Sequence, residues 1–281
     1  MDIYVLRQIA RELDSLLAGG RIQKIFQLDL NGLLLVCEDS GGGIHRLVLR
    51  GNRNHPGIFV TKHELPVAAE PSGFVLSLRN HLTGARFTRI FAGENERVVQ
   101  ISLEKIGAGR KIRWYALMAE LMGRWSNIVL VDAVSGEIVD TIRQVSNRQS
   151  RKRPLERNAP YKLPPKQNKH IFKSVLKEDF VRMVGSEKFR EEDLDGISRW
   201  LVQSFMGVSP MVASEVVGRA AGFGWNGLWR ILSDVLGELR KGITQPAIIL
   251  DLGGEPWALS VLPRIDGLVR HCQKFQSMNE A

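Results

Sequence analysis

The sequence predicts an α+β fold, in which a β-rich N-terminal domain with flanking helices precedes a helical module. Three observations favour this class. Short apolar runs separated by glycine-rich turns fill most of the first half of the chain. Apolar residues recur at helical spacing between residues 194 and 240. The 281 residues are 44% hydrophobic and 25% charged, the balance of a globular protein with one large core or two modest ones.

The first expected element is an amphipathic helix, because apolar residues recur at helical spacing from Ile3 to Leu17 and stop at Gly19-Gly20. A second helix fits residues 72–82 and ends at Gly84. Strands are expected where apolar and β-branched residues cluster between turn residues. These strands cover residues 22–27, 33–38, 44–50, 58–61, 85–91, 97–103, 111–117, 127–131 and 137–142.

A basic segment separates the β-rich part from the helical part. Between Arg143 and Lys169 nine Lys or Arg residues face one acid, Glu156, and four prolines disfavour a helix. We therefore expect an extended linker. The predicted domains are residues 1–168, which end in this linker, residues 169–243, which form the helical module, and residues 244–281, which return to a β-hairpin around Gly253-Gly254.

The helical module is expected to contain a helix-hairpin-helix. Its helices fit residues 171–184, 194–206, 210–221 and 228–240. Between two of them, Gly207 can take a left-handed turn, Ser209 can cap the next helix and Pro210 occupies its favoured first position. Such a hairpin can present a helix N-terminus to a phosphate, or it can serve only as a tight connection.

Charge and composition point to a polyanionic partner. The net charge is +9 and the pI is near 9.8, and excess Lys and Arg attract nucleic acid whether or not bases are read. No apolar stretch is long enough to span a bilayer and no secretion signal begins the chain, which favours the cytoplasm. The two cysteines and the histidines lack metal-ligand spacing, so neither a metal nor a cofactor is expected.

The run from Gly123 to Asn127 offers a candidate binding loop. Arg124, Ser126 and Asn127 supply a guanidinium, a hydroxyl and an amide at a backbone corner, a donor set suited to phosphate or sugar oxygens. An alternative remains open, because Ser and Asn before a strand also complete turns by bonding to their own backbone.

Several motifs together resemble one protein family. Met122-Gly123-Arg124 with Ser126-Asn127-Ile128 and Leu130-Val131-Asp132 resembles the signature of NFACT proteins, also known as fibronectin-binding A proteins. Four further segments follow in the family's order: residues 19–27, 78–86, 161–165 and 207–213. The resemblance covers nearly the whole chain. NFACT proteins usually continue into a coiled coil, so we expect these residues to be the N-terminal part of a longer protein.

The resemblance implies a fold similar to the N-terminal domain and helix-two-turn-helix of formamidopyrimidine-DNA glycosylases. Those enzymes attack with an N-terminal proline, whereas this chain begins Met1-Asp2-Ile3. Serine or cysteine triads, a P-loop and a glycine-rich dinucleotide motif are also missing from the sequence. We therefore expect no enzymatic activity and no catalytic residue.

The resemblance also implies a function, that of an RqcH-type ribosome quality-control factor. Such factors bind tRNA and large ribosomal subunits obstructed by peptidyl-tRNA, and they support template-free tailing of the stalled chain, chiefly with alanine. An acidic-arginine pair is implicated in engaging the tRNA in family members, and Glu96-Arg97 stands at the matching place. Here glutamate replaces the usual aspartate, which extends the carboxylate further from the backbone.

Other cations complete the candidate RNA site. Arg21, Lys24 and Arg79 are candidates of lower rank, since Arg21 and Lys24 point in different directions on a regular strand. Accessory cations are expected from the linker, at Arg148, Arg151, Lys152 and Arg153. Two alternatives remain open: a surface adhesin that binds fibronectin, and a non-catalytic, DNA-binding relative of the glycosylases.

Overall fold

The computed structural model describes residues 2–94, 96–165, 167–187, 189–190, 192–251, 253–262 and 272–279. The chain divides into two compact units, and helix α1 (Ile3–Leu17) contributes to both. Ile9–Pro165 belong to the first unit, and Asp2–Gln8 join the described residues from 167 onward in the second. No helix among the described residues is long and apolar enough to cross a membrane.

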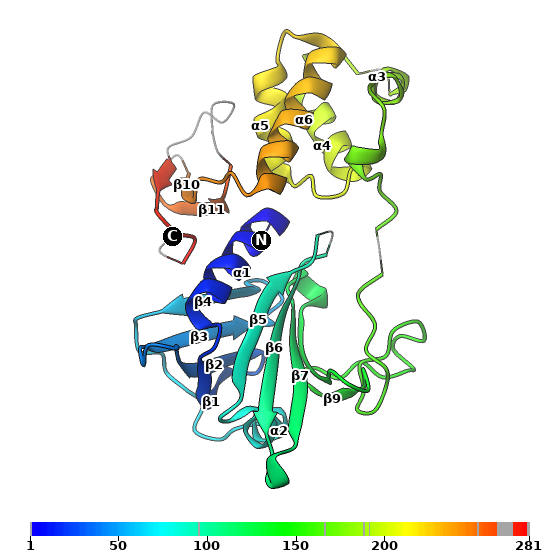
Figure 1. Cartoon of the computed structure of the whole chain (residues 1–281). Helices are drawn as coiled ribbons and strands as arrows, with labels where there is room; N and C mark the ends of the chain where they lie inside the picture. Colours follow the sequence, from blue (N-terminus) through cyan, green and yellow to red (C-terminus); the bar gives the residue numbers. More distant parts are fainter. Residues whose placement is uncertain are drawn as a thin grey trace. The chain divides into compact units, whose positions relative to one another are not determined.

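The first unit is built on a nine-stranded antiparallel sheet (Figure 1). The strands lie in the order β4-β3-β2-β1-β5-β6-β7-β8-β9, so most neighbours in the sheet are also neighbours in sequence. Their bounds are β1 Arg21–Asp29, β2 Gly32–Glu38, β3 Ile44–Arg50, β4 Gly57–Thr61, β5 Arg86–Ala92, β6 Val98–Ile106, β7 Ile112–Glu120, β8 Asn127–Asp132 and β9 Ile138–Thr141. The predicted α+β class is confirmed as a mixed fold with a large antiparallel sheet and several helices.

Both predicted helices of this unit are present at the expected places. Helix α1 buries the apolar stripe that predicted it, including Leu6, Leu13 and Leu17. Helix α2 (Gly73–Leu82) begins after Ser72, whose hydroxyl accepts a hydrogen bond from the backbone N–H of Val75. Both helices therefore start and stop where local signals in the sequence place them.

The antiparallel register divides the loops between two ends of the sheet. One end of strands β6–β8 carries the beginning of β6 at Val98, the end of β7 at Glu120 and the beginning of β8 at Asn127. We call it the loop end. The opposite end carries the row Arg21, Arg86, Glu104 and Trp114, in which each residue pairs with the next, and we call it the hairpin end.

The basic segment after β9 is only partly the extended linker that the sequence predicts. No helix forms between residues 143 and 165, as expected. The segment nevertheless folds back on the sheet, through β-bridges between Val145 and Leu155 and between Glu137 and Pro160. Leu155 of this segment is buried among apolar residues of β6–β9. Burial of this one apolar side chain holds the otherwise polar segment against the sheet.

Besides the beginning of α1 and one 3-10 turn, the described residues of the second unit form four α-helices and three short strands. Their bounds are α3 Lys177–Ser186, α4 Leu194–Ser204, α5 Pro210–Ala220, α6 Gly224–Lys241, β10 Ala247–Leu250, β11 Pro256–Ser260 and β12 Cys272–Lys274. The helix expected from residue 171 begins only at Lys177, since Phe172–Ser174 form a 3-10 turn whose Phe172 is buried. The strand β12 was not predicted; it pairs with β10.

The hairpin before α5 packs against the first residues of the chain. Gly207 has a φ of +77°, and a β-carbon added there would lie 3.2 Å from the Tyr4 hydroxyl. Ser209 caps α5 by accepting from the N–H of Val212 at 3.2 Å, and Pro210 is the first helical residue, as the sequence predicts. The turn therefore requires glycine for its conformation and for its contact with Tyr4.

We predict that Gly207→Ala lowers the free energy of unfolding by more than Gly222→Ala does. Gly222 is the matched control, because its φ is +79° but nothing lies within 4 Å of an added β-carbon. The left-handed backbone alone costs about 1–2 kcal/mol in each variant. Thermal or urea unfolding measures the difference. Equal losses would show that Tyr4 moves aside without cost, and that the contact does not constrain the hairpin.

Candidate functional site

The loop end of the sheet brings together segments that are far apart in sequence. The N–H of Leu121 donates to the carbonyl of Arg97 at 2.8 Å, which joins the β7–β8 loop to the residue before β6. The guanidinium of Arg143 donates to the carbonyl of Arg124 at 3.1 Å. The backbone carbonyl of Arg53 lies 3.8 Å from the position of a β-carbon on Gly123. Four arginines thus meet around residues 121–126.

A close backbone approach explains how the loop after β3 reaches this group. A β-carbon on Gly51 would lie 3.6 Å from Ile128 and 3.7 Å from the backbone of Asn127. Strands β3 and β8 are separated by five strands in the sheet order, so the sheet must curve strongly here. Glycine at position 51 allows that approach, and Arg53 follows it by two residues.

The side chain of Asn127 holds the two neighbouring loops in place. It is fully buried, and its amide nitrogen donates to the carbonyl of Arg143 at 2.8 Å. Its amide oxygen accepts from the N–H of Ile128, the hydroxyl of Thr141 and the N–H of Arg143. The amide is thereby satisfied within the protein, and it fixes Arg143 beside the beginning of β8.

Ser126 is also turned inward. Its hydroxyl accepts from the N–H of Met122 at 2.9 Å, and the residue is only 1% exposed. For Ser126 and Asn127 the structure favours the alternative left open by the sequence, in which both residues bond to nearby backbone. Neither is placed to touch a ligand directly, because their polar groups are buried and engaged by the backbone and by Thr141. Their contribution is to position Arg124 and Arg143.

Arg124 and Trp125 form the exposed tip of the loop. The guanidinium carbon of Arg124 lies 5.0 Å from the centre of the Trp125 ring, and Trp125 is 65% exposed. Arg53 is exposed and Arg97 is partly exposed. In the described part of the chain none of Arg53, Arg97 and Arg124 has an ion-pair partner. Three cations and one aromatic face are thus available to a ligand at this end.

Glu96 lies beside Arg97 and is partly buried. Asn95, which precedes Glu96, lies outside the described residues. The pair therefore lies at the loop end, near Arg124.

Glu120 is a buried carboxylate that binds Arg153, one of the predicted accessory cations. It is fully buried at the end of β7, and the guanidinium of Arg153 binds both of its oxygens. The hydroxyl of Tyr161 donates to the same carboxylate at 2.9 Å. Burial, followed by the charge of Glu120, raises the pKa of Tyr161. Arg153 therefore anchors the basic segment to the sheet.

The remaining candidates lie elsewhere. Arg21 stands at the hairpin end of the sheet, and Arg79 donates from α2 to the carbonyl of Ile25 at 2.8 Å, so neither joins Arg97. Lys24 is exposed in the middle of β1. The linker residues Arg148, Arg151 and Lys152 are exposed.

The hairpin at Gly207, Ser209 and Pro210 belongs to the second unit. An acidic side chain already lies at the start of α5. The pKa of Asp2 is raised by burial, while a hydrogen bond with Ser209 acts in the opposite direction. A phosphate at this helix N-terminus would have to displace that carboxylate or bind beside it.

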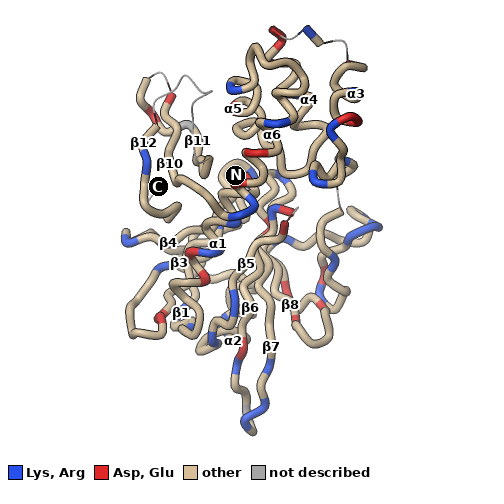
Figure 2. The backbone as a smooth tube through the Cα atoms, turned by 45° about the horizontal axis from the view of Figure 1, so that its top comes forward, with Lys and Arg blue, Asp and Glu red and all other residues tan. Residues whose placement is uncertain are grey.

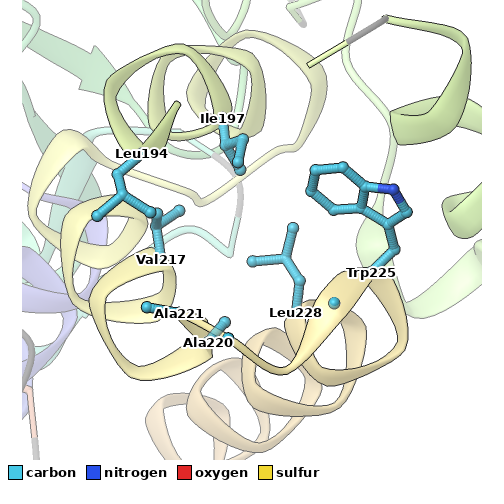
Figure 3. Close-up of a pocket in the computed structure, with 9 residues that line it drawn as sticks. Leu194, Ile197, Val217, Ala220, Ala221, Trp225 and Leu228 are labelled. Atoms are coloured by element: carbon cyan, nitrogen blue, oxygen red, sulfur yellow. The ribbon is translucent and has the colours of Figure 1, made fainter. Parts of the chain in front are cut away.

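A hollow of the second unit is lined by apolar side chains and glycines (Figure 3). It lies among α4, α5 and α6, and Figure 3 shows Ile197, Val217, Trp225 and Leu228 around it. No charged side chain lines this cavity. No group of three His, Cys, Asp or Glu side chains suited to a metal ion occurs in the described ranges of either unit.

Sequence reasoning missed two members of the loop-end group, Arg53 and Trp125. Arg53 stands in the polar loop Gly51-Asn52-Arg53-Asn54, whose composition marks it as a turn but not as a neighbour of Arg124. The fold alone shows that proximity.

Comparisons with known proteins agree on one family. The sequence model of the NFACT N-terminal and middle domains matches residues 2–281. Among curated proteins, the chain is 28% identical over 272 residues to the Rqc2 homolog RqcH of Bacillus subtilis, covering 97% of this chain and 46% of that protein. It is 36% identical over 165 residues to the Rqc2 homolog RqcH of Streptococcus pneumoniae, covering 58% of this chain and 30% of that protein. The chain thus spans less than half the length of these relatives.

Solved structures share the fold. The N-terminal part of the fibronectin/fibrinogen-binding protein of Streptococcus suis superposes with a TM-score of 0.76 at 24% identity, covering 100% of this chain and 96% of that one. The N-terminal domain of the fibronectin-binding protein PavA of Streptococcus pneumoniae superposes with a TM-score of 0.64 at 28% identity, covering 99% and 95%.

We predict that Asn127→Asp lowers the free energy of unfolding by about 2–4 kcal/mol, because it buries a charge and sets a carboxylate oxygen against the carbonyl of Arg143. Asn54→Asp adds the same charge at an exposed position of the loop after β3 and should change stability by less than about 0.5 kcal/mol. Urea unfolding distinguishes the two variants. A small effect of Asn127→Asp would mean that the buried amide does not hold the loops.

We predict a loss of stability at alkaline pH that depends on Tyr161. A raised pKa in the folded state means that the unfolded chain releases this proton first. The contribution of protonated Tyr161 to the free energy of unfolding is therefore fully present below about pH 10 and is lost as the pH rises further. Tyr161→Phe should flatten this alkaline limb and cost about 1 kcal/mol at neutral pH through the lost hydrogen bond. Identical slopes for both proteins between pH 9 and 11 would contradict the assignment.

Proposed function

Because the chain belongs to the NFACT family, we propose that it forms the tRNA- and large-subunit-binding region of a ribosome quality-control factor. One observation carries the proposal: Arg53, Arg97 and Arg124 are available beside an exposed Trp125 at one end of the sheet. Arginine forks match phosphate oxygens, and an indole face accepts an unpaired base. The name of the relatives, Rqc2 homolog RqcH, supports the ribosomal context.

In this proposal the residues of the loop end divide into contacts and supports. Arg97, Arg124 and Arg53 neutralise phosphates of the tRNA, and Trp125 stacks on a base or ribose. Ser126 and Asn127 act through the backbone, because they hold Arg124 and Arg143 in place. Glu96 stands next to Arg97 and excludes phosphates from one side of it by charge. The exposed linker cations Arg148, Arg151 and Lys152 add attraction without sequence preference.

The proposed activity is binding and positioning, not catalysis. The ribosome would form each peptide bond, while this region helps to hold an alanine-accepting tRNA against a large subunit that carries peptidyl-tRNA. Template-free tailing would belong to the whole protein in the cytoplasm. In this proposal the hairpin at Gly207–Pro210, the expected counterpart of the helix-two-turn-helix of DNA glycosylases, supplies a further phosphate contact. The carboxylate of Asp2, which bonds with Ser209, competes with a phosphate there.

A second candidate is binding of fibronectin. It is favoured by the description of the structural neighbours as fibronectin-binding proteins. The third reading, a non-catalytic DNA-binding relative of glycosylases, predicts that duplex DNA with an abasic site competes effectively with tRNA.

We predict that Arg97→Ala and Arg124→Ala each weaken tRNA binding by about tenfold or more, and that each reduces the dependence of log Kd on log salt by about one phosphate contact. Fluorescence anisotropy with labelled tRNA at several salt concentrations measures both quantities. Unlabelled tRNA, abasic duplex DNA and fibronectin serve as competitors.

Lys62→Ala is the control, because it removes one exposed positive charge just beyond β4, away from the loop end. Its tRNA affinity should remain within about twofold of the wild type at moderate salt. If all three variants lose affinity equally, net charge explains the binding and the loop end is not a site. Preferential binding of fibronectin that survives in both arginine variants would favour the adhesin.

A further inference from the structure

The turn between β6 and β7 projects beyond its neighbours at the hairpin end of the sheet (Figure 1). Pairing between β5 and β6 ends at Arg86 and Glu104, and pairing between β7 and β8 ends at Tyr115 and Asp132. Strands β6 and β7 continue to pair as far as Ile106 and Ile112. Residues 105–113 are therefore a two-stranded ribbon without a paired strand on either side, and we call them the projecting hairpin.

One face of the projecting hairpin is apolar and exposed. Ile106 faces Ile112 directly across the ladder, and Trp114 lies on the same face two residues further along. Their exposures are 62%, 53% and 41%. The same face of β6 and β7 buries Val98 and Met118 under the returning basic segment. The apolar face therefore continues beyond the part that the basic segment covers, and Ile106, Ile112 and Trp114 are exposed there. Exposed apolar patches of this kind are typical of sites of association.

The hairpin is strongly positive. Figure 2 shows basic residues at its turn, where Arg110 and Lys111 are exposed. On the face opposite the isoleucines, Lys105 stands directly across from Arg113, a like-charge pair that destabilises a ladder. Burial, followed by the charge of Arg113, lowers the pKa of Lys105. Residues 105–114 contain no acid to balance these four cations.

The acid nearest to these residues in sequence, Glu104, is already engaged. The carboxylate of Glu104 accepts from Arg86 at 2.6 Å, and Arg21 pairs with Arg86 in the next strand, so the row beside Trp114 keeps a positive surplus. A partner of opposite charge would relieve both this surplus and the repulsion between Lys105 and Arg113.

The apolar face and the four cations of the projecting hairpin indicate which kind of molecule can bind there. A second copy of the chain would bring the same four cations against themselves. A nucleic acid would satisfy the cations but would leave Ile106 and Ile112 without a suitable surface, because aliphatic branches neither stack on bases nor bind phosphates. An apolar centre with tryptophan, surrounded by arginine and lysine, has the composition of a protein interface.

We propose that the projecting hairpin is a docking site for an acidic, apolar segment of a partner protein. Its aliphatic side chains would cover Ile106, Ile112 and Trp114, and its carboxylates would pair with Arg110 and Lys111. The site stands at the opposite end of the sheet from Arg97 and Arg124, and it does not depend on the proposed RNA site.

Selection from a displayed library of random peptides tests the proposal, with the full chain as bait and the double variant Ile106→Ser/Ile112→Ser as counter-selection. We expect the selected peptides to combine two or more Asp or Glu residues with aliphatic or aromatic residues. Affinity of a synthesised peptide should fall about tenfold in the double variant and several-fold in Arg110→Ala/Lys111→Ala. Replacing its acids by amides should have a similar effect.

Leu30→Ser is the control, since Leu30 is 83% exposed in the turn between β1 and β2, outside the projecting hairpin, and its variant should bind as the wild type does. Thermal unfolding verifies that the variants fold. The proposal is overturned if no peptide depends on the hairpin, or if the selected peptides lack acids. It is also overturned if Ile106→Ser/Ile112→Ser weakens binding to tRNA or to phosphatidylglycerol vesicles, because the occupant would then be an RNA or a lipid surface.

Discussion

The buried amide of Asn127 is the interaction on which the arrangement of the loop end depends. Its four hydrogen bonds join the first residue of β8 to Ile128, Thr141 and Arg143. Both polar atoms of this buried amide have hydrogen-bond partners within the protein. Because a different arrangement of the loops would leave them unsatisfied, these bonds fix the loop geometry. Gly51 packs on the same backbone, and its small size brings Arg53 to the group. A curved sheet and one polar side chain thus gather arginines from four separate segments.

A second buried polar group, the carboxylate of Glu120, decides which cation of the basic segment has a structural role. Glu120 is fully buried and binds Arg153, with Tyr161 as an additional donor. A lone carboxylate at this depth would be costly, so the basic segment that supplies Arg153 is held against the sheet. The same folding back leaves Arg148, Arg151 and Lys152 on the surface. Positive charge near the loop end is therefore divided between a structural pair and residues available to a ligand.

Local signals in the sequence predicted most elements of the fold, and distant contacts account for what they missed. Glycine stops and periodic apolar residues located α1 and α2, and the short apolar runs located nine strands. The sheet order and the curvature could not be predicted, because they depend on approaches such as that of Gly51 to Ile128. For the same reason Arg53 was overlooked. Arg153 was assigned to RNA because its partner, Glu120, stands 33 residues earlier and cannot be recognised from the sequence. Ser126 and Asn127 were singled out from the sequence as candidate ligand donors, whereas their burial favours a role in holding the backbone.

Photochemical crosslinking of tRNA to the intact chain, followed by mass spectrometry of the crosslinked peptides, tests the central claim most directly. The account predicts crosslinks in the loops that carry Arg53, Arg97 and Trp125, because an exposed indole stacked on a base is a favourable crosslinking partner. Crosslinks confined to residues 148–152 or to the hairpin at residues 207–210 would contradict it, since the arginines gathered by Asn127 would then not be the RNA-binding surface.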